Sequence, residues 1–375
     1  MAAPSAPSSL SLDMGPAPSF ARVFVKSQFC TKTKRVALSP ETSLTGKTVL
    51  VTGASTGLGY HACRHFLSLN LSRLILAVRS VAKGERVAQE FRAKYPNATI
   101  EVWELEMSDY DSVIGFSKRV AAEFDNNSSA VEAEPKEHQQ RKKARLDIAV
   151  LNAGMTGATF TRDKKTGHCE VVQVNYLSTV LLSVLLMPVM RDEAGGNPGR
   201  LCIVGSGASH MAKLPNRHKR PFLASFDDPA VQPWEPAERY FASKALGMLF
   251  FVRLIDYLPS PDELVVNLVD PGYCKGTDLH RDAKGLMRIM LSATKELTGR
   301  PLEDGAWTYV DAAVVKGKES HGCFVMDWDI RPFINVVYEP EGQGLLDALF
   351  EETVDELSFA GVRKILHDMK RKRTA

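Results

Sequence analysis

Tyr240 and Lys244 are the residues of this sequence whose types and spacing most directly suggest chemistry. They stand four positions apart in RYFASKALG (239–247), a stretch without Gly or Pro until its last residue. On a helix, residues i and i+4 share one face, so the lysine ammonium can lie beside the phenol. A nearby cation favours the phenolate and lowers the pKa of a tyrosine from about 10, which suits proton transfer to or from a substrate oxygen. Alone, the motif is also consistent with a half-buried tyrosine and a solvated lysine.

Two further polar residues could complete such a site. Ser206 ends the apolar run RLCIVGS (200–206), and its hydroxyl could hydrogen-bond a substrate oxygen and stabilise charge that develops there. Ser209, three positions on, is the alternative for this role. Asn175 lies just inside an apolar helix, where it could hold a water molecule that relays protons to Lys244. The alternatives are a strand-end hydroxyl for Ser206 and a helix cap for Asn175.

The elements that must position these residues follow one pattern from residue 47 onward, in which short apolar runs alternate with helical segments. The runs are 47–53, 73–78, 98–105, 146–154, 200–206, 263–272 and 321–327. Continuously apolar runs are typical of strands buried on both faces of a parallel sheet. Their alternation with helices predicts a doubly wound Rossmann sheet of about seven strands, in one three-layer α/β/α domain over residues 45–365.

A glycine-rich turn follows the first of these runs. TGASTGLG (52–59) places Gly53, Gly57 and Gly59 in a G-x-x-x-G-x-G spacing between a predicted strand and a predicted helix. Glycine permits a tight turn and lets a pyrophosphate approach the backbone. The helix that follows presents unpaired N–H groups to the phosphates. The turn therefore predicts dinucleotide binding, since a plain strand-to-helix turn would rarely need three spaced glycines.

The end of the second predicted strand favours NADP(H) over NAD(H). Residues 71–84 contain no Asp or Glu, but they include Arg79 and Lys83. An acidic side chain at this point accepts hydrogen bonds from the ribose hydroxyls, whereas a cation suits a 2′-phosphate. The alternative is an ordinary exposed arginine at a strand end.

Taken together, the motifs resemble those of the short-chain dehydrogenase/reductase family, in its retinol-dehydrogenase-like and protochlorophyllide-reductase-like branch. The resemblance covers about residues 45–360. It rests on TGASTGLG (52–59), LEMSDYDSV (105–113), NAG (152–154), VNYLST with Asn175, RLCIVGS with Ser206, YFASK (240–244) and PGYCKGT (271–277). The overall texture is similar to fungal reductases of secondary metabolism.

The resemblance implies further cofactor contacts. Ser55, Thr56 and Leu58 would lie in the glycine-rich turn, and Lys244 would also donate to the nicotinamide ribose. Glu106 and Met107 would lie beside the adenine, Asn152, Ala153 and Gly154 along the cofactor, Pro271 and Gly272 beside the nicotinamide, and Thr277 near its carboxamide. Two departures from the family pattern stand out: Glu106 replaces the more usual Asp, and the loop from Pro271 to Thr277 is one residue longer than usual.

Composition limits the other classes of partner. The formal net charge of +3 argues against nucleic acid, and six scattered cysteines without C-x-x-C spacing predict reduced thiols and no metal site. The most apolar segment, 177–190, is too short to span a bilayer, contains Pro188, and is expected to be a buried helix.

Four segments are expected to stand apart from the sheet. They are a flexible N-terminal lead (1–44), a mobile polar insertion (125–145), a proline-rich insertion near the substrate mouth (207–238) and a basic tail (366–375). We expect a cytoplasmic protein, with an organellar location through the lead as the alternative. The resemblance also implies a homodimer or homotetramer through helices 174–192 and 237–257.

The expected activity is NADP(H)-dependent interconversion of a carbonyl and an alcohol on a small to medium lipophilic substrate. Three alternatives on the same scaffold are a double-bond reductase, an epimerase and a dehydratase, because the cofactor end is shared. A non-catalytic NADP-binding scaffold or sensor is a further alternative, although Ser206, Tyr240 and Lys244 are all present.

Overall fold

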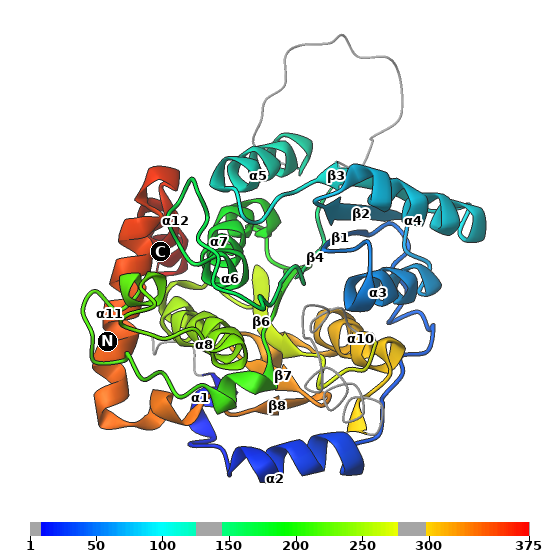
Figure 1. Ribbon diagram of the computed structural model, residues 1–375. Coiled ribbons are helices and arrows are strands. Elements are labelled where there is room, and N and C mark those ends of the chain that lie inside the picture. Colours follow the sequence, from blue (N-terminus) through cyan, green and yellow to red (C-terminus); the bar gives the residue numbers. More distant parts are fainter. Residues whose placement is uncertain (1–8, 125–144, 277–297, 375) are drawn as a thin grey trace.

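An eight-stranded sheet runs through the protein, seen here in a computed structural model that describes residues 9–124, 145–276 and 298–374 (Figure 1). The strand order is β3-β2-β1-β4-β5-β6-β7-β8. All neighbours pair in parallel except β7 and β8. The strands are β1 Thr48–Thr52, β2 Arg73–Val78, β3 Thr99–Glu104, β4 Ile148–Leu151, β5 Gly199–Val204, β6 Leu264–Asp270, β7 Phe324–Met326 and β8 Asp329–Arg331.

All seven predicted strands are present, and the doubly wound fold is confirmed. The eighth strand was not predicted. It returns from β7 through Asp327 and Trp328, whose φ angles of 56° and 58° make the tight turn of a two-residue hairpin. Its sequence, Asp-Ile-Arg, is only partly buried, so no apolar run marks it.

Helices cover both faces of the sheet. One face carries α3 Gly57–Ser68, α4 Val81–Lys94 and α10 Leu302–Val310, and the other carries α5 Tyr110–Phe124, α7 Ser178–Met190, α8 Pro236–Leu254, α11 Pro340–Glu356 and α12 Val362–Thr374. Each layer buries its own hydrophobic cluster against the sheet. The short helix α6 Glu170–Val172 leads into α7 through a π turn, Gln173–Leu177.

Helix α7 is a buried helix, as predicted. Together with α6, the segment Glu170–Met190 is long and apolar enough to cross a membrane, but 89% of its most apolar stretch is buried inside the protein. Helices α11 and α12 pack over α8 and α7. Phe350 of α11 stacks on Phe250 at 5.1 Å, and Thr353 contacts the hydroxyl of Tyr176 at 2.5 Å. Helices α7 and α8, which we expected to pair between subunits, therefore bury apolar side chains against α11 and α12 of the same chain. The oligomeric state stays a prediction.

The described part of the N-terminal lead is not the free segment that we expected. Residues 9–44 include α1 Leu10–Asp13, α2 Phe20–Val25 and a π turn, Lys26–Cys30, and the part up to this π turn lies along the sheet edge that β7 and β8 form (Figure 1). Buried serines make the attachment: Ser9 donates to the Gly322 carbonyl (2.6 Å) and Ser11 accepts from the Phe324 amide (2.9 Å). A Ser- and Pro-rich composition suggests disorder, but these hydroxyls satisfy backbone groups near β7.

The other three segments have different outcomes. Residues 125–144 of the polar insertion lie outside the described residues. The insertion 207–238 is ordered around buried Phe222 and Phe226, whose T-shaped rings lie 5.2 Å apart. The basic tail is instead the end of α12, which buries Leu366 and Met369 against the same layer as α7. The backbone of residues 366–374 continues this helix, so these residues do not form a separate tail.

Candidate active site

Strands β1, β4, β5 and β6 lie together in the middle of the sheet (Figure 1), and most of the predicted site residues that the structure describes lie at or near the carboxyl ends of the parallel strands. Strand β1 lies between β2 and β4, so the order of the strands reverses at this point. In open α/β sheets, ligands bind outside the carboxyl ends of the strands at such a reversal. The edge has a phosphate side, formed by the turn after β1, and a catalytic side, formed by the turns after β5 and β6.

On the phosphate side, the glycine-rich turn fits a dinucleotide. Gly53 and Gly57 have φ angles of 65° and 58°, which favour glycine. A Cβ on Gly59 would lie 2.4 Å from the Gly53 carbonyl oxygen, so only glycine lets α3 pack directly on the turn. Thr56, the N-cap of α3, makes no side-chain cap hydrogen bond. The backbone N–H groups around Thr56 therefore suit phosphate oxygens; Ser55 and Leu58 lie in the same turn, half-buried.

The segment Asn152–Ala153–Gly154 joins the phosphate side to the catalytic side. The Asn152 amide donates to the Thr52 carbonyl at 3.0 Å, and the Ala153 N–H donates to the Thr52 hydroxyl at 2.9 Å. A Cβ on Gly154 would lie 3.6 Å from the Lys244 nitrogen. The sequence did not indicate Tyr309 of α10, which donates to the Asn152 side-chain oxygen at 3.0 Å and fixes its orientation.

The predicted adenosine contacts lie at the ends of β2 and β3. The Arg79 side chain is 70% exposed, and its Nε lies 3.6 Å from a carboxylate oxygen of Glu106. Lys83 is exposed in the first turn of α4. Met107 is buried in the core, and its place beside the adenine stays a prediction. Arg79 and Glu106 therefore form the polar wall of this end of the site.

On the catalytic side, the fold brings Ser206 and Tyr240 together from positions 34 residues apart in the sequence. Ser206 caps a 3₁₀ turn, Gly207–Met211, and accepts from the Ala208 N–H at 3.1 Å. Tyr240 lies in the second turn of α8, where its hydroxyl interacts with the Ser206 side chain. Ser209 is buried and its hydroxyl has no hydrogen-bond partner, so Ser206, the first choice from the sequence, is the serine beside Tyr240.

The electrostatics of the pair differ from the expectation. Burial raises the pKa of Tyr240 to about 12, opposed by the hydrogen bond from Ser206. Burial lowers the pKa of Lys244 to about 8, opposed by attraction to Asp270. The Lys244 ammonium donates to the Val204 carbonyl at 2.9 Å, and we find no lowering of the Tyr240 pKa by Lys244. In this arrangement Tyr240 is a protonated phenol at neutral pH.

Asn175 is buried behind Lys244, in the π turn before α7. Its amide donates to the Met155 carbonyl (2.8 Å) and to the Ser243 hydroxyl (3.0 Å). A cavity of about 30 Å³, lined by Asn175, Lys244 and Gly205 among others, lies between α7 and α8. A water molecule needs roughly 10–15 Å³, so the cavity has room for the relay water that the sequence suggested.

Asp270 was not assigned a role from the sequence, yet it links both turns of the catalytic side. The carboxylate is buried at the end of β6, where it accepts from the Gly207 amide (2.9 Å) and from the Gly272 amide (3.0 Å). It thereby fixes the turn that follows Ser206 to the predicted nicotinamide turn, Pro271–Gly272. Its position directly before Pro-Gly was the only signal. Thr277 lies outside the described residues.

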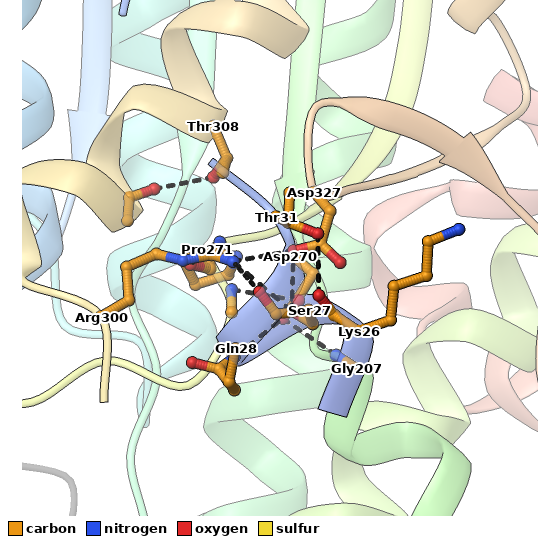
Figure 2. Close-up of polar contacts among 12 residues, drawn as sticks. Lys26, Ser27, Gln28, Thr31, Gly207, Asp270, Pro271, Arg300, Thr308 and Asp327 are labelled. Atoms are coloured by element: carbon orange, nitrogen blue, oxygen red, sulfur yellow. Dashed lines mark hydrogen bonds and ion pairs between the residues drawn. The ribbon is translucent and has the colours of Figure 1, made fainter. Parts of the chain in front are cut away.

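Arg300 anchors the Pro271–Gly272 turn from outside (Figure 2). Its guanidinium donates to the Pro271 carbonyl (3.2 Å), to the Ser27 carbonyl (3.1 Å) and to the buried carboxylate of Asp327 (2.8 Å). The Ser27 hydroxyl also donates to Asp327, at 2.7 Å. A Cβ on Gly272 would lie 2.7 Å from this guanidinium, so the turn needs glycine. Three distant segments, around residues 27, 271 and 327, thus meet at one buried arginine.

Comparison with known proteins agrees with this geometry. The family model described as short chain dehydrogenase matches residues 47–217. The chain is 44% identical to "Short chain dehydrogenase/reductase mfmJ" of Annulohypoxylon moriforme, over 97% of this chain and 99% of the relative. It is 36% identical to "Short chain dehydrogenase virL" of Hypocrea virens, over 88% of this chain and 90% of the relative.

The same fold is found among solved structures. A short chain dehydrogenase from Shigella flexneri, complexed with NADP, superposes with a TM-score of 0.51 at 18% identity, covering 77% of this chain and 100% of the other. The fold, the glycine-rich turn, the neighbouring serine and tyrosine, and two relatives matched over nearly their full length have one common explanation. The chain belongs to the short-chain dehydrogenase/reductase family of oxidoreductases.

Proposed function

We propose that this protein is an NADP(H)-dependent oxidoreductase that interconverts a carbonyl and an alcohol on a small to medium lipophilic substrate. The placement of the Ser206 and Tyr240 side chains near each other, at the carboxyl edge of the sheet, carries the proposal, because two such donors can hold one carbonyl oxygen. A bound nicotinamide supplies the hydride. Tyr240, protonated at neutral pH, donates the proton that completes the alcohol, and Ser206 orients the oxygen and stabilises its developing charge.

An aromatic wall supports a lipophilic substrate. Trp234, from the insertion 207–238, and Phe160, from the loop after β4, pack edge to face at 5.8 Å and are both half-buried. The Trp234 indole donates to the Ala158 carbonyl at 3.0 Å, which ties the insertion to that loop. The insertion leads into α8, which carries Tyr240, and the loop with Phe160 follows the segment Asn152–Gly154. An apolar substrate could therefore pack against the two rings.

Arg79 supports NADP(H) as the cofactor, and the NADP complex of the Shigella flexneri relative is consistent with it. We expect purified protein to oxidise NADPH with a panel of ketones and aldehydes, and NADH far less. Arg79→Glu should raise the KM for NADPH about tenfold or more, since a charge-assisted hydrogen bond contributes roughly 1.5–3 kcal/mol. Steady-state kinetics with both cofactors measure the change.

Arg79→Gln is the control for this prediction, because it removes the charge without placing a second carboxylate beside Glu106. This variant should raise the KM for NADPH and leave the KM for NADH unchanged. An unaltered NADPH/NADH ratio in both variants would show that another group reads the phosphate. If no member of the panel supports NADPH oxidation by the unmodified protein, the proposed reaction is wrong.

The lowered pKa of Lys244 predicts a loss of activity in alkali. The ammonium is charged below pH 8 and neutral above it, whereas Tyr240 keeps its proton to about pH 12. The kcat/KM for carbonyl reduction should therefore be level near neutral pH and fall above pH 8. Above pH 8 the unfolded state binds more protons at Lys244 than the folded state does, because the pKa of this lysine is lowered on folding. The contribution of Lys244 to the free energy of unfolding therefore increases as pH rises. Loss of stability through this lysine cannot explain the fall in activity. Rates that stay level to pH 10 would contradict a role for the Lys244 charge.

A further inference from the structure

The N-terminal segment differs from the rest of the protein in what it exposes. Among the described residues, five of the nine exposed large apolar side chains lie within residues 10–38: Leu10, Met14, Val25, Phe29 and Leu38. The sequence from 14 to 40 contains five Lys or Arg residues and no Asp or Glu. A soluble surface seldom gathers apolar and basic side chains in this way without a binding purpose.

The exposed face of α2 and the π turn after it arranges these side chains in two rows. Ala21, Val25 and Phe29 follow one another at helical spacing, and Val25 and Phe29 are 52% and 61% exposed. Arg22 follows Ala21 and Lys26 follows Val25, and both cations are also exposed. An apolar row flanked by cations is the pattern of a helix that lies in a membrane interface.

The opposite face of this helix holds it to the protein. Phe24 contacts the Tyr273 ring with a centroid separation of 6.0 Å, and Ser27 hydrogen-bonds Asp327. Figure 2 shows Lys26 directed away from the buried cluster around Arg300. The helix is thus fixed on one side, with the rows of Val25 and Phe29 and of Arg22 and Lys26 turned to solvent.

A second basic element lies beside the start of α2. Residues 209–226 carry Lys213, Arg217, Lys219 and Arg220, all exposed, and no Asp or Glu. Lys213 and Arg217 line a cavity of about 160 Å³ together with Pro18 and Phe20. The two elements together carry nine cations, so the remainder of the chain has a formal charge of −6 (+3 less +9).

Few acidic groups offset this charge. Asp304 pairs with Arg35 at 3.1 Å, and Glu339 lines the cavity with Lys213 and Arg217. Glu238 and Asp311 also attract Lys213 and Lys34, so four carboxylates lie near nine cations. The other cations of the two elements have no carboxylate within the segments themselves. The positive charge is therefore concentrated on this surface, whereas the remainder of the chain has a negative formal charge. Charges that served only solubility would be distributed evenly over the protein.

We propose that the face formed by α2, its π turn and residues 213–220 docks on an anionic lipid bilayer. The cations meet lipid phosphates and carboxylates, and Val25 and Phe29 insert among the acyl chains near the headgroups. The apolar row favours lipid over a nucleic acid or an acidic protein surface, for which the cations alone would suffice. Such docking would bring the reductase to the phase in which lipophilic molecules concentrate.

Sedimentation with vesicles tests the proposal on the full-length protein. Vesicles of phosphatidylcholine with about 30% phosphatidylserine should bind the protein, pure phosphatidylcholine vesicles should bind it much less, and salt should weaken the binding. Arg22→Glu with Lys26→Glu should weaken it at least tenfold, because each cation near an anionic surface contributes on the order of 1 kcal/mol. Val25→Ser with Phe29→Ser should weaken it several-fold and make the remainder more sensitive to salt.

Matched controls lie elsewhere on the surface. Arg86→Glu with Lys118→Glu makes the same charge change on α4 and α5, and Val231→Ser with Phe359→Ser removes the same kind of exposed apolar side chain. All four double variants should keep the unmodified thermal stability, and both controls should keep vesicle binding. The proposal fails if the unmodified protein ignores anionic vesicles or if the controls lose as much binding. It also fails if Val25→Ser with Phe29→Ser binds normally, since the surface would then suit any polyanion.

Discussion

Tyr240→Phe should lower kcat for carbonyl reduction by about 10³-fold and leave NADPH binding nearly unchanged. General acid catalysis by a positioned side chain contributes roughly 10²–10⁴-fold, and we propose the phenol beside Ser206 as the proton donor. Phenylalanine fills the same space in the second turn of α8, so the helix and Lys244 should stay in place. Single-turnover kinetics with NADPH would measure the loss.

The control for this prediction is Tyr257→Phe, which removes the same hydroxyl from a tyrosine that stacks on Phe350 in the layer of α11. It should keep full activity. Fluorescence titration with NADPH should give dissociation constants within a few-fold for the unmodified protein and both variants. If Tyr240→Phe turns over at an undiminished rate, Tyr240 is not the proton donor and the assignment of the site is wrong.

Arg300→Met should cost about 3–5 kcal/mol of unfolding free energy, the largest stability effect that we expect from a single substitution. Its removal leaves the Asp327 carboxylate buried without its cation, and breaking one partner of a buried ion pair typically costs this much. It also removes the donors to Ser27 and Pro271. Urea unfolding monitored by fluorescence would give the change.

A double-mutant cycle separates the charge from the packing. Adding Asp327→Asn to Arg300→Met removes the unpaired carboxylate, so the double variant should be more stable than Arg300→Met alone. Arg363→Met is the matched control: this arginine pairs with Glu351 and Asp355 on the surface, where an ion pair contributes about 1 kcal/mol or less. Equal losses at Arg300 and Arg363 would contradict the buried-cluster interpretation.

Local sequence patterns were sufficient for the sheet and for the motifs on its carboxyl edge. The seven apolar runs matched strands because a central parallel strand must be apolar on both faces. Gly53, Gly57 and Gly59 could be interpreted because their conformations and close contacts exclude other residues. The Tyr240–Lys244 spacing gave the shared helix face, although it could not give the pKa values, which depend on how deeply the fold buries each group.

Contacts between distant segments were beyond reach. Asp270 and Arg300 act by holding backbone groups that are far away in sequence or in other turns, and neither belongs to a motif with a distinctive composition. The serines at 9, 11 and 27 resemble those of a disordered segment until their partners near β7 are known. The cover that α11 and α12 give to α7 and α8 likewise depends on the arrangement of whole helices.

The attachment of the N-terminal segment also bears on the order in which the protein can fold as it leaves the ribosome. Ser9, Ser11 and Ser27 bond to residues 313, 313 and 300 positions later. Helices α1 and α2 therefore wait, with Phe20 and Phe24 uncovered, until residues 322–327 have emerged. Closing such long loops is slow, and uncovered apolar segments aggregate readily during synthesis. The Pro271–Gly272 turn receives its full outer support only when Ser27 and Asp327 have both met Arg300, so this part of the active site is completed late in folding.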